Sequence, residues 1–296
     1  MPFLAAAALS VSIQSSDSDP NRLSIGRAGT VQVQPGQIYD LRSSRVASVD
    51  DLAEAAQGKK FVFLGEQHAT KAHQLEEASV VRALGDHGRD VSVGMEMYTR
   101  PKQDVLDLWS AGTLTEEQFI DQSDWKHQWG FDYSFYKPVF DIVKERRLPL
   151  VGLNVPRDWV HAVATKGYAG LPTSAKLQLP PVLFLGNKDH RSVFDSLMGG
   201  HSMVGTGMEN MYAAQVLWDE GMADTAIKYT ERAPADPKAI FVVIAGGGHV
   251  MYGQGINYRI KHRKAGDGIT MVMLQSDTPV EVSRGLADFV YVSPKS

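Results

Sequence analysis

The stretch Ala239–His249 reads AIFVVIAGGGH, and it holds the two features that decide the fold. Its first part, Ile240–Ala245, is a continuous apolar run rich in β-branched residues, which is typical of a strand buried on both faces. The run stops at three consecutive glycines, Gly246–Gly248, and a histidine follows them. This stretch therefore predicts a strand of a parallel sheet that carries a polar side chain at its carboxyl end.

Four other segments repeat this design and predict further strands. Their apolar runs are Phe61–Leu64, Val91–Met95, Leu148–Leu153 and Ile269–Leu274, and helical patterns separate most of them. Strands that alternate with helices predict an α/β fold, here a three-layer arrangement of a parallel-sheet core with helices on both faces. Ahead of the first run, the sequence around Arg42–Ser44 predicts a small hairpin.

The helix expected between the first two strands is Lys71–Asp86, where apolar residues recur at helical spacing. We expect Leu75 on its buried side and His73 facing the solvent. The aromatic residues between Trp125 and Tyr136 are expected to serve mainly as core, because aromatic side chains dominate protein interiors, and the alternative is a wall for a large flat ligand.

The chain has 296 residues, which suits one large α/β domain. We expect residues 1–24 to form a tail and residues 25–296 to form this domain, with a smaller all-helical subdomain inserted at about 169–232. The tail contains the apolar run Phe3–Ile13, which resembles the hydrophobic part of a secretory signal although no Lys or Arg precedes it. We therefore expect an exported protein, in the periplasm or associated with the cell envelope. No other run reaches the roughly 20 residues that a transmembrane helix needs.

The composition excludes several classes of function. Lys and Arg number 30 against 34 Asp and Glu, a net charge of −4, which argues against nucleic acid as a partner because phosphate binding needs a concentrated basic surface. The chain has no cysteine, so disulfides, thiolate metal sites, Fe–S clusters and a cysteine nucleophile are all excluded. His, Tyr, Met and carboxylates remain as the strong ligands.

Polar residues recur where the predicted strands end. Glu66 and His68 follow the first run, Glu96 follows the second, Asn154 the third and His249 the fourth. Since ligands of open α/β sheets bind beyond the carboxyl ends of the strands, we expect these side chains to share one crevice. Imidazoles and carboxylates are ligands of Zn, Mn or Fe(II), so His68, Glu96 and His249 are candidate ligands of a divalent transition metal. Glu66 is then a candidate general base for a metal-bound water.

A second cluster lies in the helical insertion and contains His201, Met203 and Tyr212. His, Met and Tyr are residue types that ligate haem iron. Methionine at helical spacing is also typical of gap-filling core, so this cluster leaves both interpretations open.

Taken in order along the chain, these motifs resemble those of the ChaN-like haem-binding uptake family, within the Tiki/erythromycin-esterase-like superfamily. The resemblance runs from about Ile38 to Leu274. It is carried by IYD (Ile38–Asp40), LGEQH (Leu64–His68), GMEMY (Gly94–Tyr98), WGFDYSFYKPVF (Trp129–Phe140), LNVPR (Leu153–Arg157), LP (Leu179–Pro180), GHSM (Gly200–Met203), QVLWDEGMA (Gln215–Ala223) and AGGGHVMYGQGINYR (Ala245–Arg259).

The resemblance implies a haem-binding protein that acts in haem or iron uptake. Haem would lie in a cleft between the carboxyl edge of the sheet and the helical subdomain, with an axial ligand among His201, Tyr98 and Tyr212 and with Met203 nearby. Because family members hold haem near a subunit interface, a homodimer is a further implication. The chain differs from many relatives in having His201-Ser202 where they have two adjacent histidines, and in having no cysteine for a lipid anchor.

More distant relatives in the superfamily imply an alternative function. They resemble metal-dependent hydrolases, protease- or esterase-like, whose site residues lie in two GxxH motifs and an intervening Glu. In this chain those positions are Glu66, His68, Glu96 and His249, the set that the strand-end argument selects.

Overall fold

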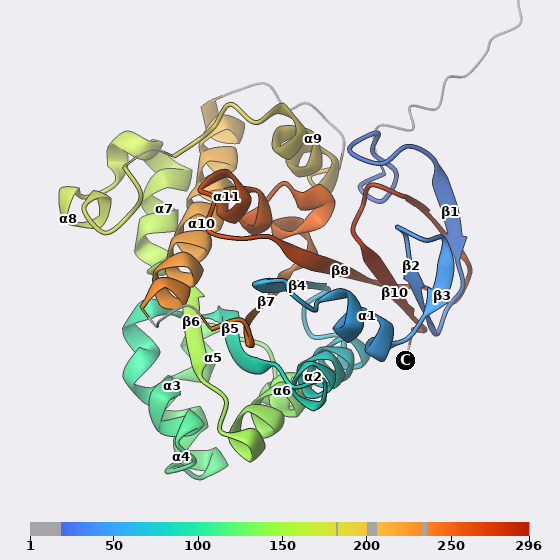
Figure 1. Ribbon diagram of the computed structural model, residues 1–296. Helices are drawn as coiled ribbons and strands as arrows, with labels where there is room; N and C mark the ends of the chain where they lie inside the picture. The colour runs from blue at the N-terminus through green and yellow to red at the C-terminus, as the bar shows by residue number, and fades with distance from the viewer. Residues whose placement is uncertain (1–18, 182, 200–205, 233–235, 296) are drawn as a thin grey trace, which may run out of the picture.

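The computed structural model describes residues 19–181, 183–199, 206–232 and 236–295 (Figure 1). The apolar run Phe3–Ile13 lies outside the described residues. So do His201 and Met203, two of the candidate haem ligands.

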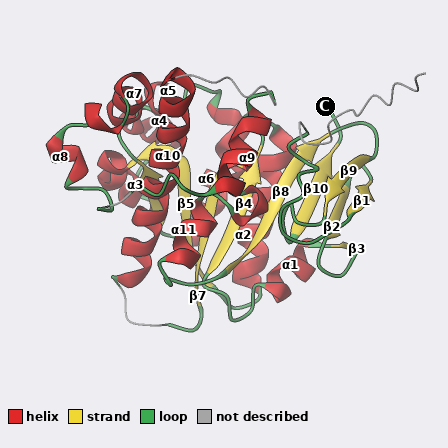
Figure 2. Cartoon of the chain, turned by 90° about the horizontal axis from the view of Figure 1, so that it is seen from above, coloured by secondary structure: helices red, strands yellow, loops and turns green. Residues whose placement is uncertain are grey.

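An eight-stranded mixed sheet forms the centre of the described chain, with the strand order β3-β2-β10-β8-β4-β7-β5-β6. The strands from β10 to β6 are parallel, whereas β2 pairs antiparallel with both β10 and β3. Strands β1 and β9 form a separate antiparallel pair, which Figure 2 shows at the β2–β3 end of the molecule. The bounds are β1 (Thr30–Val33), β2 (Gln37–Asp40), β3 (Arg45–Ala47), β4 (Phe61–Glu66), β5 (Asp90–Thr99), β6 (Leu150–Asn154), β7 (Ala239–Gly246), β8 (Gly268–Gln275), β9 (Val280–Ser283) and β10 (Phe289–Ser293).

The α/β fold predicted from the sequence is confirmed, and each of the five apolar runs forms a strand, β4 to β8. The hairpin around Arg42–Ser44 is confirmed as the β2–β3 pair, in which Ser44 has a positive φ of 58°. A purely parallel sheet is not found, because the β2–β3 hairpin adds to one edge and β2 pairs antiparallel with β10.

Helices pack against both faces of the sheet (Figure 1). Alternate residues of a strand point to opposite faces, so Val62 and Leu64 of β4 join the core under α1, α2 and α6. Phe61 and Phe63 join the core under α10 and α11. The bounds are α1 (Val49–Ala55), α2 (Lys71–Asp86), α3 (Gln103–Ser110), α4 (Glu116–Ser123), α5 (Trp125–Gln128), α6 (Tyr133–Arg146), α7 (Arg157–Lys166), α8 (Thr173–Lys176), α9 (Lys188–Leu197), α10 (Thr206–Glu231) and α11 (Ile256–His262).

Helix α2 has the predicted bounds but buries an unexpected face. Leu75 is 47% exposed, whereas His73, Gln74 and Glu77 are fully buried, so the expectations for Leu75 and His73 were wrong. Gln74 donates from Nε2 to Glu66 Oε2, and His73 can occupy this face because the surrounding backbone binds it. The Nδ1 atom of His73 accepts a hydrogen bond from the Gln67 N–H at 3.0 Å, and its Nε2 lies 3.2 Å from the Leu274 carbonyl oxygen.

His73 makes the stability of the protein depend on pH. Burial lowers the pKa of His73 to about 4. In the unfolded chain the side chain takes up a proton below about pH 6.5, whereas the folded protein does so only below about pH 4. Stability is therefore lost as the pH falls through this window, by at most about 1.4 kcal/mol per pH unit.

In urea unfolding, we expect the free energy of unfolding of His73→Asn to fall less than that of the wild type between about pH 7 and about pH 4.5. His262→Asn is the matched control, because His262 is exposed and should leave the wild-type pH dependence unchanged. Equal pH dependence in the His73 variant and the wild type would contradict the assignment.

Candidate functional site

Four of the residues that the strand-end argument selects meet at the carboxyl edge of the sheet. Strand β7 lies between β4 and β5, so His249 in the turn η4 (Gly247–His249) comes between Glu66 and Glu96. The Nδ1 atom of His68 lies 2.7 Å from Glu66 Oε1, and the Nε2 atom of His249 lies 3.3 Å from Glu96 Oε1. The Gly246 N–H donates to Glu96 Oε2 at 2.7 Å.

Gly246 keeps these pairs close together. A Cβ atom at this position would lie 2.8 Å from His68 Cε1, so glycine is what lets the strand end approach the His68 ring this closely. Asn154, from the end of β6, donates from Nδ2 to the Glu96 carbonyl at 3.1 Å and so supports the backbone of β5.

A cavity of about 380 Å³ opens at these residues, and we call it the strand-end cavity. Glu66, His68 and His249 line it together with apolar residues of α9. Glu96 instead borders a neighbouring cavity of about 330 Å³. The remaining residues that line the strand-end cavity are Gln67, His190, Phe194, Leu197, Met198, Gln215 and Gly246–Gly248.

Asp219 of α10 is a site residue that the sequence argument missed. It is fully buried, and its Oδ1 lies 2.6 Å from His249 Nδ1. Its Oδ2 lies 2.8 Å from His190 Nε2 and 3.5 Å from Arg259 Nη1. An acidic pair within the apolar stretch QVLWDEGMA was the signal available in the sequence, because a carboxylate on a buried helix face needs a partner.

The network extends from Asp219 to Tyr212. The Nδ1 atom of His190 lies 3.1 Å from the Tyr212 hydroxyl, which also donates to the Asn187 carbonyl at 3.3 Å. Tyr212 is 3% exposed and lines a separate cavity of about 660 Å³. A continuous chain of buried polar groups thus joins that cavity to the strand-end cavity.

The other candidate haem ligand within the described residues, Tyr98, is enclosed by the core. Its side chain is fully buried among Phe119, Trp125 and Phe140, and its hydroxyl donates to Ser123 Oγ at 2.9 Å. A ligand in the strand-end cavity has no access to this hydroxyl. We therefore do not include Tyr98 in the proposed site.

The aromatic residues from Trp125 to Tyr136 have two roles, as part of the core and as neighbours of His68. Trp125 and Tyr136 are buried as expected, and the Tyr136 hydroxyl donates to Glu66 Oε1 at 2.9 Å. Trp129 and Phe131 instead contact the His68 ring, with ring centroids 4.7 Å and 6.0 Å away. This segment therefore supplies an apolar wall beside His68 as well as core.

The buried charges of the site stabilise one another. Burial alone would raise the pKa of Glu96, but the adjacent His249 holds it at about 2. Burial would likewise lower the pKa of His249, but Glu96 and Asp219 raise it to about 10. His249 is thus an imidazolium between two carboxylates, whereas His68 has a carboxylate on Nδ1 only.

The metal site predicted at His68, Glu96 and His249 gains no support from this geometry. In the described part of the chain, no group of three or more His, Asp or Glu side chains is arranged to hold a metal ion. Carboxylates contact both ring nitrogens of His249, Asp219 at Nδ1 and Glu96 at Nε2.

Comparison with known proteins places this geometry in context. A family model described as haem-binding uptake, Tiki superfamily, ChaN matches residues 52–260. The solved structure of ChaN from Campylobacter jejuni, described as showing cofacial haem binding, is 16% identical, with a TM-score of 0.66, and the match covers 86% of this chain and 95% of that chain. At this identity the likeness shows a shared fold alone.

Two further solved structures overlap less well. A mutant erythromycin esterase in its open conformation is 16% identical over 76% of this chain and 71% of that chain, with a TM-score of 0.46. A toxin effector domain from Vibrio vulnificus is 17% identical over 85% of this chain and 40% of that chain, with a TM-score of 0.44. No curated protein sequence matches the chain significantly.

Proposed function

Because the chain belongs to the haem-binding uptake family ChaN of the Tiki superfamily, we propose that it binds haem and acts in haem or iron uptake. The observation that carries this proposal is the environment of His68 at the strand-end cavity. Glu66 orients the ring through Nδ1, and the described residues provide no hydrogen-bond partner for Nε2. The side chain is about one-third exposed, at 34%.

The residues around His68 fit a porphyrin. A haem site needs apolar walls and an axial ligand held in orientation by a second group. Trp129 stands nearly perpendicular to the His68 ring, at 85°, and Phe194 and Leu197 of α9 line the strand-end cavity together with His68. Bound haem would supply an iron that takes a nitrogen or oxygen ligand from the protein. We propose His68 as that ligand.

Tyr212 is the second candidate for the axial ligand, since it lines the separate cavity of about 660 Å³. Its hydroxyl is already engaged by His190 and Asn187, which makes it less accessible than His68 Nε2. His201 and Met203 stay sequence-based predictions. A homodimer around the ligand likewise stays a proposal from the resemblance.

We also propose that the protein acts outside the cytoplasm, on the basis of the apolar run Phe3–Ile13. Among the described residues, no helix is long and apolar enough to cross a membrane.

The alternative of a metal-dependent hydrolase is less well supported by the same residues. It requires a metal at His68, Glu96 and His249, and the described residues contain no group of three or more His, Asp or Glu side chains arranged to hold one. We therefore retain haem binding as the proposed function.

Titration of the purified apoprotein with haemin tests the proposal. We expect a saturable Soret shift with one haem per chain, because the strand-end cavity presents one accessible imidazole nitrogen. Tyr212→Phe removes only a hydroxyl that other residues already engage, so its affinity should stay within about twofold of wild type. The absence of a saturable shift in the wild-type protein would contradict haem binding.

A further inference from the structure

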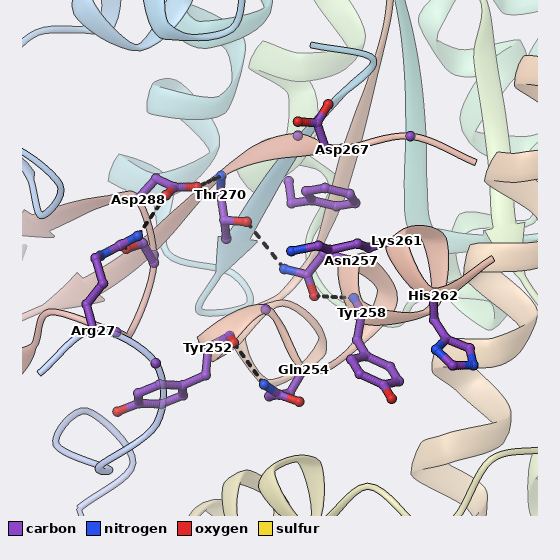
Figure 3. Close-up of a pocket in the computed structure, with 17 residues that line it drawn as sticks. Arg27, Tyr252, Gln254, Asn257, Tyr258, Lys261, His262, Asp267, Thr270 and Asp288 are labelled. Carbon is purple, nitrogen blue, oxygen red and sulfur yellow. Dashed lines mark hydrogen bonds and ion pairs between the residues drawn. The ribbon is translucent and has the colours of Figure 1, made fainter. Parts of the chain in front are cut away.

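A cavity of about 790 Å³ lies between α11, the start of β8 and the loop before β10 (Figure 3), and we call it the α11 cavity. It shares no lining residue with the strand-end cavity. Its volume falls within the range of about 300–1,000 Å³ that is typical of small-molecule sites. The residues that matter for its chemistry are Arg27, Thr270 and four side chains of α11, Asn257, Tyr258, Lys261 and His262.

Two aromatic side chains of α11, Tyr258 and His262, line the α11 cavity. Tyr258 and His262 are four residues apart on α11, so they lie on the same face of the helix. Their ring centroids are 5.6 Å apart, and the ring planes differ by 10°. The ring of Phe184, which does not line the cavity, packs nearly parallel to both, within 12° of Tyr258 and 7° of His262. Nearly parallel rings of this kind offer stacking area to a planar conjugated ligand.

The charges around the cavity leave one cation without a partner. Arg27 pairs with Asp288 at 3.3 Å, and Asp267 pairs with Lys59 at 2.6 Å. Lys261 has no hydrogen-bond or ion-pair partner for its ammonium group among the described residues, and Figure 3 shows its side chain extending into the space between α11 and β8. Since both lining aspartates are already paired, the available charge in this cavity is positive.

We propose that the α11 cavity binds a planar aromatic carboxylate, with the ring against Tyr258 and His262 and the carboxylate at Lys261. An ammonium group and a carboxylate form a charge-assisted hydrogen bond, and the aromatic wall selects a flat ligand. Two sources share this chemistry: a small aromatic acid, and a porphyrin that carries propionate groups. The proposal concerns a site separate from the haem site at His68.

The test is isothermal titration calorimetry of the full chain with 2-naphthoate. Lys261→Gln should weaken binding about tenfold, because it removes the charge that faces the ligand. Lys264→Gln is the matched control: it removes the same charge from an exposed lysine that does not line the cavity, so affinity should stay within about twofold. Naphthalene-2-carboxamide lacks the charge and cyclohexanecarboxylate lacks the planar ring, so each should bind at least about tenfold more weakly than 2-naphthoate.

Metal-free protoporphyrin IX, titrated into the same variants, distinguishes the two sources. Binding that is tighter than that of 2-naphthoate and is weakened by Lys261→Gln assigns the cavity to a porphyrin. If the porphyrin binds more weakly than 2-naphthoate, and Lys261→Gln weakens the binding of 2-naphthoate, the cavity is assigned to a small aromatic acid. The proposal is overturned if neither compound binds the wild type at about 1 mM, or if Lys261→Gln and Lys264→Gln bind both compounds equally well.

Discussion

Asp219→Ala is expected to lower the free energy of unfolding by about 3–5 kcal/mol, because it removes the carboxylate that balances three buried cationic or polar partners. Asp219 contacts His249, His190 and Arg259, and all three partners are less than 10% exposed. Without it, Glu220, at 3.2 Å, is the one carboxylate among the described residues that still pairs with the Arg259 guanidinium, and Glu96 is the one that still pairs with the His249 imidazolium. Breaking one side of a buried ion pair costs far more than breaking an exposed one.

Urea unfolding at neutral pH measures this effect. Asp195→Ala is the matched control, because Asp195 pairs with Arg191 at 2.8 Å but is 31% exposed, and its loss should cost no more than about 1 kcal/mol. The pH dependence provides a second readout. The pKa of His249 in the folded protein is about 10, so the ion pairs of His249 with Asp219 and Glu96 stabilise the wild type fully below about pH 6.5. This stabilisation is lost as the pH rises through 10. That loss should be smaller in Asp219→Ala, and a cost below about 1 kcal/mol for Asp219→Ala would refute the role assigned to this network.

Residues at the ends of parallel strands could be placed together from the sequence, because topology alone brings those ends to one edge of the sheet. Glu66, Glu96 and His249 follow this rule, and the His68 ring lies beside Gly246 at the same edge. Tyr98 shows where the rule fails. The sequence suggests that the second strand ends near Met95, but β5 continues to Thr99 with a register shift, so Tyr98 belongs to the strand and lies inside the core.

Asp219 and His73 could not be placed because helical periodicity counts apolar residues only. On α2 and α10, polar side chains occupy buried positions, and the partners that make this tolerable come from other elements of the fold. His73 binds backbone near Gln67 and Leu274, and Asp219 binds side chains of α9, η4 and α11. Such partnerships depend on tertiary packing, which no local pattern in one sequence contains.

His68→Ala is expected to weaken haemin binding about a hundredfold, which corresponds to about 2.7 kcal/mol. The variant removes the proposed axial nitrogen and leaves the apolar walls in place, so a weak, ligand-independent association with the cavity should remain. Glu66→Gln should weaken binding about tenfold, because Glu66 orients the His68 ring through the 2.7 Å contact at Nδ1 but does not itself reach the ligand. The order of the two effects separates a ligand from the residue that positions it.

Haemin titration followed by the Soret band measures both variants, and far-UV circular dichroism verifies that they remain folded. His127→Ala is the matched control: His127 is a surface histidine whose side chain is 78% exposed, it lies outside the strand-end cavity, and its removal should leave the affinity unchanged. An equal loss of haemin affinity in His68→Ala and His127→Ala would indicate non-specific surface binding of haemin. Wild-type affinity in His68→Ala, with a saturable shift retained, would keep haem binding but assign the axial ligand to a different residue, with Tyr212 the next to be substituted.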